Sequence, residues 1–237
     1  MKIGIFDSGI GGLSVLQELH KRARDLEFYY ISDEAYCPYG NKSNAQVVKR
    51  CFEIVDILIE QNVDLIVLAC NSATAVAIDE LRKKFDIKFV GIEPYINLLN
   101  KHNWHNEYKG VVLTTQMTAA SKRFKDLKLR LDPESILEHK ACPNLASIVE
   151  SFYKDRDVSL MKLSVEKELE SIISEGYSHI ILGCTHYPLI KTTIEKLTNA
   201  KAYSPCIYVA EQALRLLEYK KSELEQETFQ FISTLNG

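Results

Sequence analysis

Two cysteines follow apolar segments of the chain that are similar to each other. Cys70 comes after residues 65–69, and Cys184 comes after residues 179–183. Free cysteine is among the most buried residue types, so one such cysteine would be interpreted as a small core residue. Two in matching positions favour reactive thiols, because the N-terminus of a helix lowers the pKa of a thiol beside it. Such thiols on opposite sides of a carbon acid could invert it, one removing a proton and the other delivering one.

Small polar residues follow four of the predicted strands. In an open α/β sheet, ligands bind outside the carboxyl ends of the strands, where helix N-termini favour an anion. The pattern therefore predicts a site for a small ligand that bears a carboxylate. The four polar segments are Asp7-Ser8-Gly9, Cys70-Asn71-Ser72, Thr114-Thr115-Gln116 and Cys184-Thr185-His186.

The glycines at 9, 11 and 12 match no phosphate-binding loop, since neither G-x-G-x-x-G nor G-x₄-G-K-[ST] is present. We interpret them as tight packing of the first helix against its strand.

Short apolar runs alternate with longer amphipathic stretches along the chain. This alternation is typical of a mostly parallel sheet covered by helices on both faces, and it predicts an α/β fold. Strands are expected at 3–6, 28–31, 64–69, 88–91, 110–113, 135–139, 179–183 and 229–232. Helices are expected from 13, at 44–61 and 73–85, from 119, and at 145–152, 160–175 and 209–221, with a loop at 33–43.

The two halves of the chain resemble each other. Residues 65–72 align with 179–186, and residues 2–6 align more weakly with 108–112, which suggests a duplicated unit. The polar stretch 100–107 has no periodicity and is predicted to be a linker. We therefore expect two pseudosymmetric α/β domains, residues 1–98 and residues 99–206, with the segment 207–237 packing back on the first.

Composition excludes several classes of protein. The 237 residues include 29 Lys and Arg against 32 Asp and Glu, and this balance gives no basic surplus for nucleic acid. The chain has neither a run of about 18 apolar residues nor the apolar stretch of a signal peptide at its start, so we expect a soluble, cytoplasmic protein without membrane contact. The six cysteines are expected to be free thiols, and their spacing does not suggest a metal site.

Several motifs together resemble the cofactor-independent glutamate racemases. They are Asp7-Ser8-Gly9-Ile10-Gly11-Gly12, Pro38-Tyr39-Gly40-Asn41-Lys42-Ser43, Ala69-Cys70-Asn71-Ser72-Ala73, Ala141-Cys142-Pro143 through Glu150, and Gly183-Cys184-Thr185-His186-Tyr187-Pro188-Leu189. The resemblance covers nearly the whole chain. It implies two α/β domains with the active site in the cleft between them, and it implies no cofactor.

The resemblance also implies roles for individual residues. Cys70 and Cys184 would be the two acid/base groups, assisted by Asp7 and His186, with Glu150 as a third auxiliary group. The substrate-binding positions would be Ser8, Pro38, Tyr39, Gly40, Asn71, Ser72, Thr118 and Thr185. Asp7 is equally compatible with a helix-capping role, and Tyr39 with simple packing.

The activity implied by the resemblance is interconversion of L- and D-glutamate, which supplies D-glutamate for peptidoglycan and hence for cell-wall biogenesis and cell shape. The ligand would be the small-molecule substrate, and the resemblance allows a homodimer. One alternative is a racemase of aspartate or of both acids, although His186 stands where aspartate racemases resembling this family typically have Glu. The other is a non-catalytic binding protein on the same fold.

Overall fold

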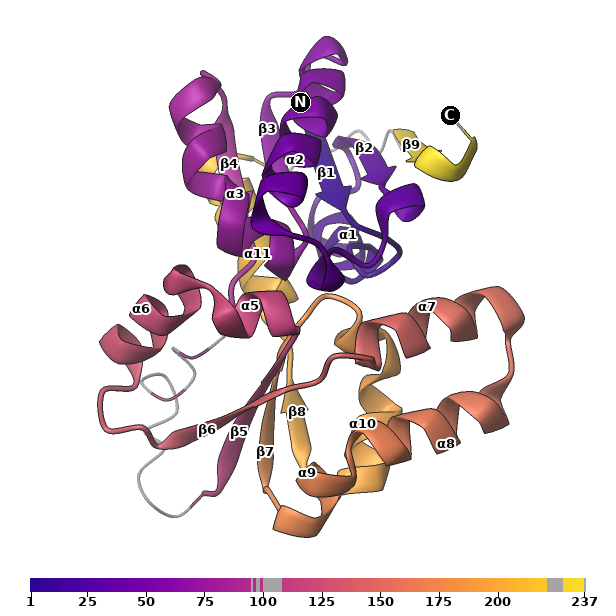
Figure 1. Cartoon of the computed structure of the whole chain (residues 1–237). Coiled ribbons are helices and arrows are strands. Elements are labelled where there is room, and N and C mark those ends of the chain that lie inside the picture. Colours follow the sequence, from indigo (N-terminus) through magenta and orange to yellow (C-terminus); the bar gives the residue numbers. More distant parts are fainter. Residues whose placement is uncertain (95, 97–98, 100–107, 221–227, 237) are drawn as a thin grey trace.

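The computed structural model describes residues 1–94, 96, 99, 108–220 and 228–236. Its described strands form two parallel sheets, which lie in the upper and lower lobes of Figure 1. The first sheet has the order β4-β3-β1-β2-β9 and the second the order β6-β5-β7-β8. The strands are β1 (Lys2–Asp7), β2 (Glu27–Ser32), β3 (Leu65–Leu68), β4 (Lys88–Gly91), β5 (Gly110–Thr114), β6 (Leu137–Ala141), β7 (His179–Gly183), β8 (Lys201–Tyr203) and β9 (Thr228–Ser233).

Helices cover both faces of the first sheet because its strands are apolar on both faces. Ile3 and Ile5 of β1 pack in the cluster formed with α1 (Leu13–Arg22) and α11 (Cys206–Leu216). Phe6 packs in the opposite cluster, with α2 (Asn44–Glu60) and α3 (Asn71–Lys84). This alternation follows from the two-residue period of a strand.

The second sheet is covered in the same way. Val111 and Leu113 of β5 pack against the helices α7 to α10, whereas Val112 packs on the side of α6. The helices of this lobe are α5 (Gln116–Ala120), α6 (Lys122–Leu131), α7 (Leu145–Asp155), α8 (Val158–Glu168), α9 (Glu170–Glu175) and α10 (Lys191–Thr198). No helix in the described part of the chain is long and apolar enough to cross a membrane.

The two sheets have the same topology. Read from the other edge, the second sheet has the order β8-β7-β5-β6, which matches β4-β3-β1-β2 of the first. Strand β1 therefore corresponds to β5, and β3 corresponds to β7, so Cys70 and Cys184 follow equivalent strands. The predicted α/β class and pseudosymmetric pair of units are confirmed.

The C-terminal part of the chain returns to the first lobe, as Figure 1 shows by the position of both termini in its upper half. Helix α11 packs against α1, and β9 extends the first sheet by pairing in parallel with β2. The rings of Tyr30 and Phe231 stack there, with centroids 5.5 Å apart. The predicted linker at 100–107 lies outside the described residues, and the exact division at 98 and 206 stays a prediction.

Some predicted boundaries were wrong. The helix expected from residue 119 begins at Gln116, because the Thr115 side chain accepts a hydrogen bond from the Thr118 N–H and caps it. It breaks at Ser121, which caps α6 by accepting from the Phe124 N–H. The helix expected at 160–175 is divided into α8 and α9, and the last helix spans 206–216 rather than 209–221. The short elements α10 and β8 were not predicted.

Candidate active site

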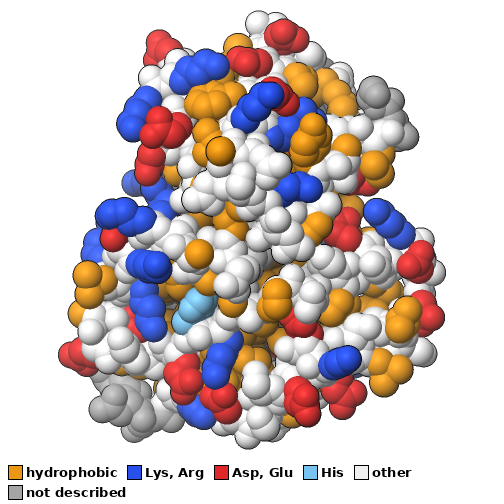
Figure 2. All heavy atoms as spheres, viewed as in Figure 1, with side chains coloured by type: hydrophobic (Ala, Val, Ile, Leu, Met, Phe, Trp, Pro, Cys, Tyr) orange, Lys and Arg blue, Asp and Glu red, His pale blue; other side chains and the backbone are white. Residues whose placement is uncertain are grey.

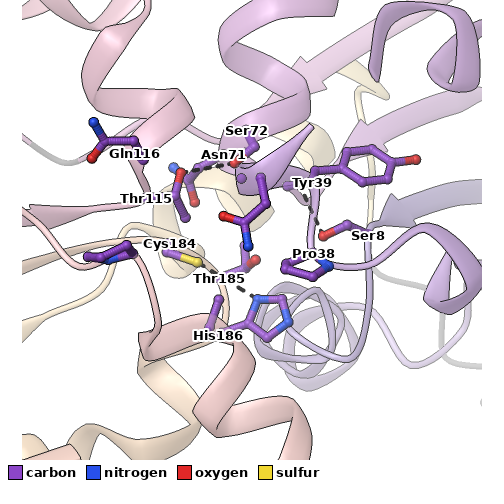
Figure 3. A pocket seen from close by; sticks show the side chains of 15 residues that line it. Ser8, Pro38, Tyr39, Asn71, Ser72, Thr115, Gln116, Cys184, Thr185 and His186 are labelled. Carbon is purple, nitrogen blue, oxygen red and sulfur yellow. Dashed lines mark hydrogen bonds between the residues drawn. The ribbon is translucent and has the colours of Figure 1, made fainter. Parts of the chain in front are cut away.

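A pocket lies between the two lobes, at the carboxyl ends of β1, β3, β5 and β7 (Figure 3). Its cavity volume is about 20 Å³, which is room for about one water molecule. The pocket is lined by Ser8, Pro38, Tyr39, Gly40, Asn41, Cys70, Asn71, Ser72, Thr115, Gln116, Pro143, Ala146, Cys184, Thr185 and His186. Both predicted thiols are therefore in one site, and the predicted cleft location agrees with the structure.

Cys70 is the N-cap of α3, and its sulfur accepts a hydrogen bond from the Ala73 N–H at 3.5 Å. The thiol donates to Ser8 Oγ at 3.6 Å. Burial raises the pKa of the Cys70 thiol well above its usual value, and the negative charge of Asp7 adds to the rise, outweighing the Ala73 and Ser8 hydrogen bonds. The expectation of a lowered pKa at this helix N-terminus was therefore wrong for Cys70, because burial has the larger effect.

Cys184 has an imidazole as its partner. Its sulfur lies 3.7 Å from His186 Nδ1, and His186 Nε2 lies 2.6 Å from Glu150 Oε1. Figure 3 shows the Cys184 sulfur directed toward the His186 ring. The chain after β7 enters a 3-10 helix, Tyr187–Ile190, whereas the chain after β3 enters the α-helix α3 directly. Thiol, imidazole and carboxylate form a continuous path along which a proton could move.

The imidazole and the carboxylate of this path stabilise each other's charge. Burial alone would lower the pKa of His186, but hydrogen bonds to Cys184, Cys37 and Glu150 raise that pKa well above its usual value. Burial would likewise raise the pKa of Glu150, and the His186 interaction together with the Ile10 N–H lowers it instead. The Ile10 N–H donates to Glu150 Oε1 at 3.0 Å. The pair therefore favours an imidazolium next to a carboxylate.

Asp7 lies at the end of β1 and is fully buried. Its Oδ2 accepts hydrogen bonds from the N–H groups of Gly9 and Gly12, at 3.1 and 3.0 Å, and Thr185 Oγ1 donates to its Oδ1 at 3.3 Å. The carboxylate thus holds the turn before α1, but it does not cap that helix, because Gly12 is the N-cap and has no side-chain capping bond. Burial raises the pKa of Asp7 to about 6, against the charge of His186, so its proton can exchange near neutral pH.

The glycine-rich turn does more than pack a helix on a strand. A Cβ at Gly9 would lie 1.9 Å from Glu150 Oε1, and one at Gly11 would lie 2.4 Å from His186 Nδ1. Side chains of the second lobe therefore reach the site only because these positions lack a Cβ. The earlier interpretation of the glycines as helix-to-strand packing was incomplete.

The structure brings most of the predicted substrate-binding residues to the pocket wall. Tyr39 lines the wall, but its side chain points away from Cys184 and His186 (Figure 3), with its ring against Phe6 and its hydroxyl donating to Asp33 Oδ2 at 2.6 Å. Arg50 holds that carboxylate with hydrogen bonds of 2.8 and 2.9 Å. The predicted residues that line the pocket are Ser8, Pro38, Tyr39, Gly40, Asn71, Ser72 and Thr185.

Thr118 is the exception among these predicted residues. It lies in α5, buried, and its hydroxyl accepts a hydrogen bond from Thr115 Oγ1 at 3.1 Å. Because Thr115 is the N-cap of α5, Thr115 and not Thr118 faces the pocket, where its hydroxyl lies 3.0 Å from Ser72 Oγ. The position of Thr115 in the polar segment after β5 was the signal that could have identified it. Asn41, Gln116, Pro143 and Ala146 were also missed.

One buried acceptor in the pocket has no protein partner. The Asn71 side-chain nitrogen donates to the Ile92 carbonyl at 3.4 Å, but Asn71 Oδ1 has no hydrogen-bond partner among the described residues. A buried acceptor without a partner is costly, so a donor from a ligand would be favoured there.

Comparison with known proteins gives a consistent result. The family model for Asp/Glu/Hydantoin racemase matches residues 3–213. A glutamate racemase of Sulfurihydrogenibium sp. is 36% identical over 224 residues, which cover 94% of this chain and 82% of the relative. Glutamate racemase 2 of Bacillus subtilis is 35% identical, over 85% of this chain and 75% of its own length.

Solved structures are also similar. The Escherichia coli glutamate racemase, in complex with L-glutamate and the activator UDP-MurNAc-ala, has a TM-score of 0.84 at 28% identity, covering 98% of this chain and 87% of that one. An aspartate racemase of Picrophilus torridus has a TM-score of 0.60 at 18% identity, over 94% of this chain and 96% of that one, and shows a common fold. By the matched residues 3–213 and by these relatives, this chain belongs to the Asp/Glu/Hydantoin racemase family.

Proposed function

We propose that this chain interconverts L- and D-glutamate by proton transfer at Cα between substrate and two thiols, without a cofactor. The observation that carries the proposal is the position of Cys70 and Cys184. They follow equivalent strands of two duplicated sheets and line the same pocket. Racemisation needs a base on one face of Cα and an acid on the other, and a duplicated unit supplies two such groups from opposite sides.

In one direction, the Cys70 thiolate removes the proton from Cα, and the Cys184 thiol delivers its own proton to the opposite face. In the other direction the two thiols exchange these roles. A thiolate of raised pKa is a strong base toward the weakly acidic α-proton, but the same rise lowers the fraction of Cys70 that is thiolate, so a neighbouring group must first accept the thiol proton. Asp7 and His186 then exchange protons with the thiols and restore their starting states.

The polar groups of the pocket match the charges of glutamate. The lining residues include neither Lys nor Arg, so carboxylates would be held by N–H groups at the N-terminus of α3 and by the hydroxyls of Ser8 and Ser72. The free Asn71 Oδ1 is an acceptor for the substrate ammonium. Since the cavity holds about one water, the lobes must move apart to admit an amino acid.

The wider setting is part of the same proposal. D-Glutamate made by this reaction would enter peptidoglycan synthesis, in the cytoplasm, and the enzyme would work as a homodimer.

Proton NMR in D₂O tests the proposal directly. Purified, reduced protein is incubated without added cofactor with L-glutamate and, separately, with L-aspartate, while circular dichroism follows optical activity. We expect the glutamate α-proton signal and the ellipticity to decay together, and aspartate to remain unchanged. Decay on aspartate would move the assignment to that substrate. Glutamate that binds without exchange, in folded protein, would leave only the binding-protein alternative.

A further inference from the structure

Three different metal-ligating side chains converge beside the pocket. The Cys37 sulfur, a Glu150 carboxylate oxygen and a His186 ring nitrogen all lie within 4.8 Å of one another. Cys37 Sγ lies 3.5 Å from Glu150 Oε1, the oxygen that His186 Nε2 also contacts. The three residues come from the loop before Pro38, from α7 and from the segment after β7. Their spacing along the chain matches no metal motif, so the cluster is visible only in three dimensions.

From this geometry we propose that Cys37, Glu150 and His186 bind a thiophilic divalent cation such as Zn²⁺, and that the cation inhibits the enzyme. Zinc binds sulfur, imidazole nitrogen and carboxylate oxygen tetrahedrally at about 2.0–2.3 Å, which places its ligand atoms about 3.3–3.7 Å apart. The Cys37-to-Glu150 distance fits this range. The 2.6 Å between Glu150 and His186 must lengthen by less than about 1 Å.

The charges of the cluster also suit a divalent cation. On binding, the Cys37 thiol and the His186 Nε2 position each release a proton to solvent. The thiolate and the Glu150 carboxylate then balance the two charges of the metal, and the imidazole is a neutral ligand. Glu150 and His186 are buried, whereas Cys37 is partly exposed and gives the ion a route from solvent.

The surrounding backbone already accommodates this convergence. Gly9 leaves the space in which the carboxylate and the thiol meet, since a Cβ there would lie 1.9 Å from Glu150 Oε1 and 3.0 Å from Cys37 Sγ. Three protein ligands leave a fourth tetrahedral position for water or for a group of the substrate.

The consequence for catalysis follows from the position of His186. Its Nδ1 faces Cys184, and its Nε2 faces the cluster. A metal ion on Nε2 prevents the ring from carrying a second proton, so the imidazole can no longer exchange protons with Cys184. Binding of the cation is independent of the proposed function, whereas the inhibition rests on it.

Cobalt and zinc titrations of the metal-free, reduced full chain test the inference. Cys37→Ser removes the sulfur ligand and keeps a hydroxyl, with Cys37→Ala as a second variant should the first not fold. Cys206→Ser is the matched control, because Cys206 is a free thiol that contacts Ser14 instead of the cluster. The first readout is the sulfur-to-cobalt charge-transfer absorption with Co²⁺, and the second is the ZnCl₂ concentration that halves each variant's own metal-free rate.

We expect a cobalt–thiolate band in wild type and in Cys206→Ser, and we expect this band to be lost in Cys37→Ser. The ZnCl₂ concentration that halves the rate should rise about tenfold or more in Cys37→Ser only, because even changes to groups that merely orient the ligands of a metal site cost about 10–100-fold in affinity. Equal inhibition of all three proteins with no Cys37-dependent band would overturn the inference, because the metal would then act on Cys70 or Cys184. A Cys37-dependent band in protein that does not racemise glutamate would retain the metal site and refute the proposed function instead.

Discussion

The surroundings of the two thiols differ although the strands that carry them are equivalent. Cys70 caps an α-helix and contacts the Ala73 N–H and the Ser8 hydroxyl, with the buried Asp7 carboxyl as its charged neighbour. Cys184 precedes a 3-10 helix and faces His186, which is in turn held by Glu150. Cys70 thus has a carboxyl group as its charged neighbour, whereas Cys184 contacts an imidazole.

This difference shows which part of the site the duplication determines. The repeated strand order places two thiols at equivalent positions on opposite sides of one pocket, which is the geometry that inversion at Cα requires. The auxiliary side chains are not repeated. In the proposed mechanism, the proton that leaves each thiol therefore goes to a different group, and the two directions of the reaction need not have the same slowest step.

The largest expected effect comes from removing either thiol. Cys70→Ser and Cys184→Ser should each lower kcat for racemisation about 10³–10⁴-fold, the upper part of the range for a positioned acid or base. Each thiol acts on one face of Cα, so the thiol that remains cannot replace the one that was removed. Circular dichroism with L- and D-glutamate measures the loss. Cys206→Ser should retain activity, because the Cys206 sulfur contacts Ser14 and does not line the pocket. Loss confined to one of the two thiol variants would disprove the two-thiol scheme.

Removing the auxiliary groups should lower activity by about 10²–10³-fold and reveal the asymmetry. Because the two enantiomers are equal in free energy, kcat/KM is equal in both directions for any variant, so isotope effects must report the difference. With α-deuterated substrates, His186→Asn should raise the primary isotope effect for the enantiomer that Cys184 deprotonates, and Asp7→Asn should raise it for the other. An increase for the same enantiomer in both variants would contradict separate proton partners.

Much of the site could be predicted because it depends on strand ends. Polar residues after apolar runs mark the carboxyl edge of a parallel sheet, so Cys70 and Cys184 could be assigned to one pocket from sequence. Thr118 could not be distinguished from Thr115 in this way, since the choice depends on where α5 begins, and a side-chain cap decides that. The raised pKa of Cys70 could not be predicted from the sequence either, because it results from burial of the thiol, and that burial depends on how the two lobes meet.

The missing elements have a similar cause. Strand β8 has three residues, and α10 has eight residues with the polar sequence KTTIEKLT, so neither carries a clear periodic pattern. The second lobe's packing stabilises them. The contacts of Gly9 and Gly11 with side chains of the other lobe likewise join residues about 140 and 175 positions apart, which no local pattern records.

The two auxiliary groups should also differ in how they link stability to pH. The pKa of Asp7 is about 6 in the folded protein against 3.8 for the ordinary carboxyl group, so protonated Asp7 stabilises the folded state. This stabilisation is lost as pH rises from about 4 to 6. Asp7→Asn should therefore gain about 2–3 kcal/mol in free energy of unfolding relative to wild type across that interval, then stay level. Because the pKa of His186 is raised, its protonated imidazole stabilises the folded state fully below pH 6.5, and this stabilisation is lost at alkaline pH.

Urea unfolding between pH 4 and 9 measures both linkages. The difference between Asp7→Asn and wild type should grow with pH, whereas the deficit of His186→Asn should shrink above neutrality. Parallel, pH-independent differences in the two variants would show that neither group titrates with a shifted pKa in the fold.

The smallest effect is expected at the exposed contact between the lobes, and it tests whether the asymmetry is local to the thiols. Arg123 of α6 donates to Glu93 at 2.6 Å and to both oxygens of Asp79 of α3 at 3.0 Å. Asp79 is 64% exposed, so Arg123→Ala should cost about 0.2–1 kcal/mol, and less at high salt. Asp79→Ala and the double variant isolate the coupling. This contact joins the two lobes and touches neither thiol. Its loss should therefore change the isotope effects for the two enantiomers equally. An unequal change would mean that the position of the lobes, and not only His186 and Asp7, distinguishes Cys70 from Cys184.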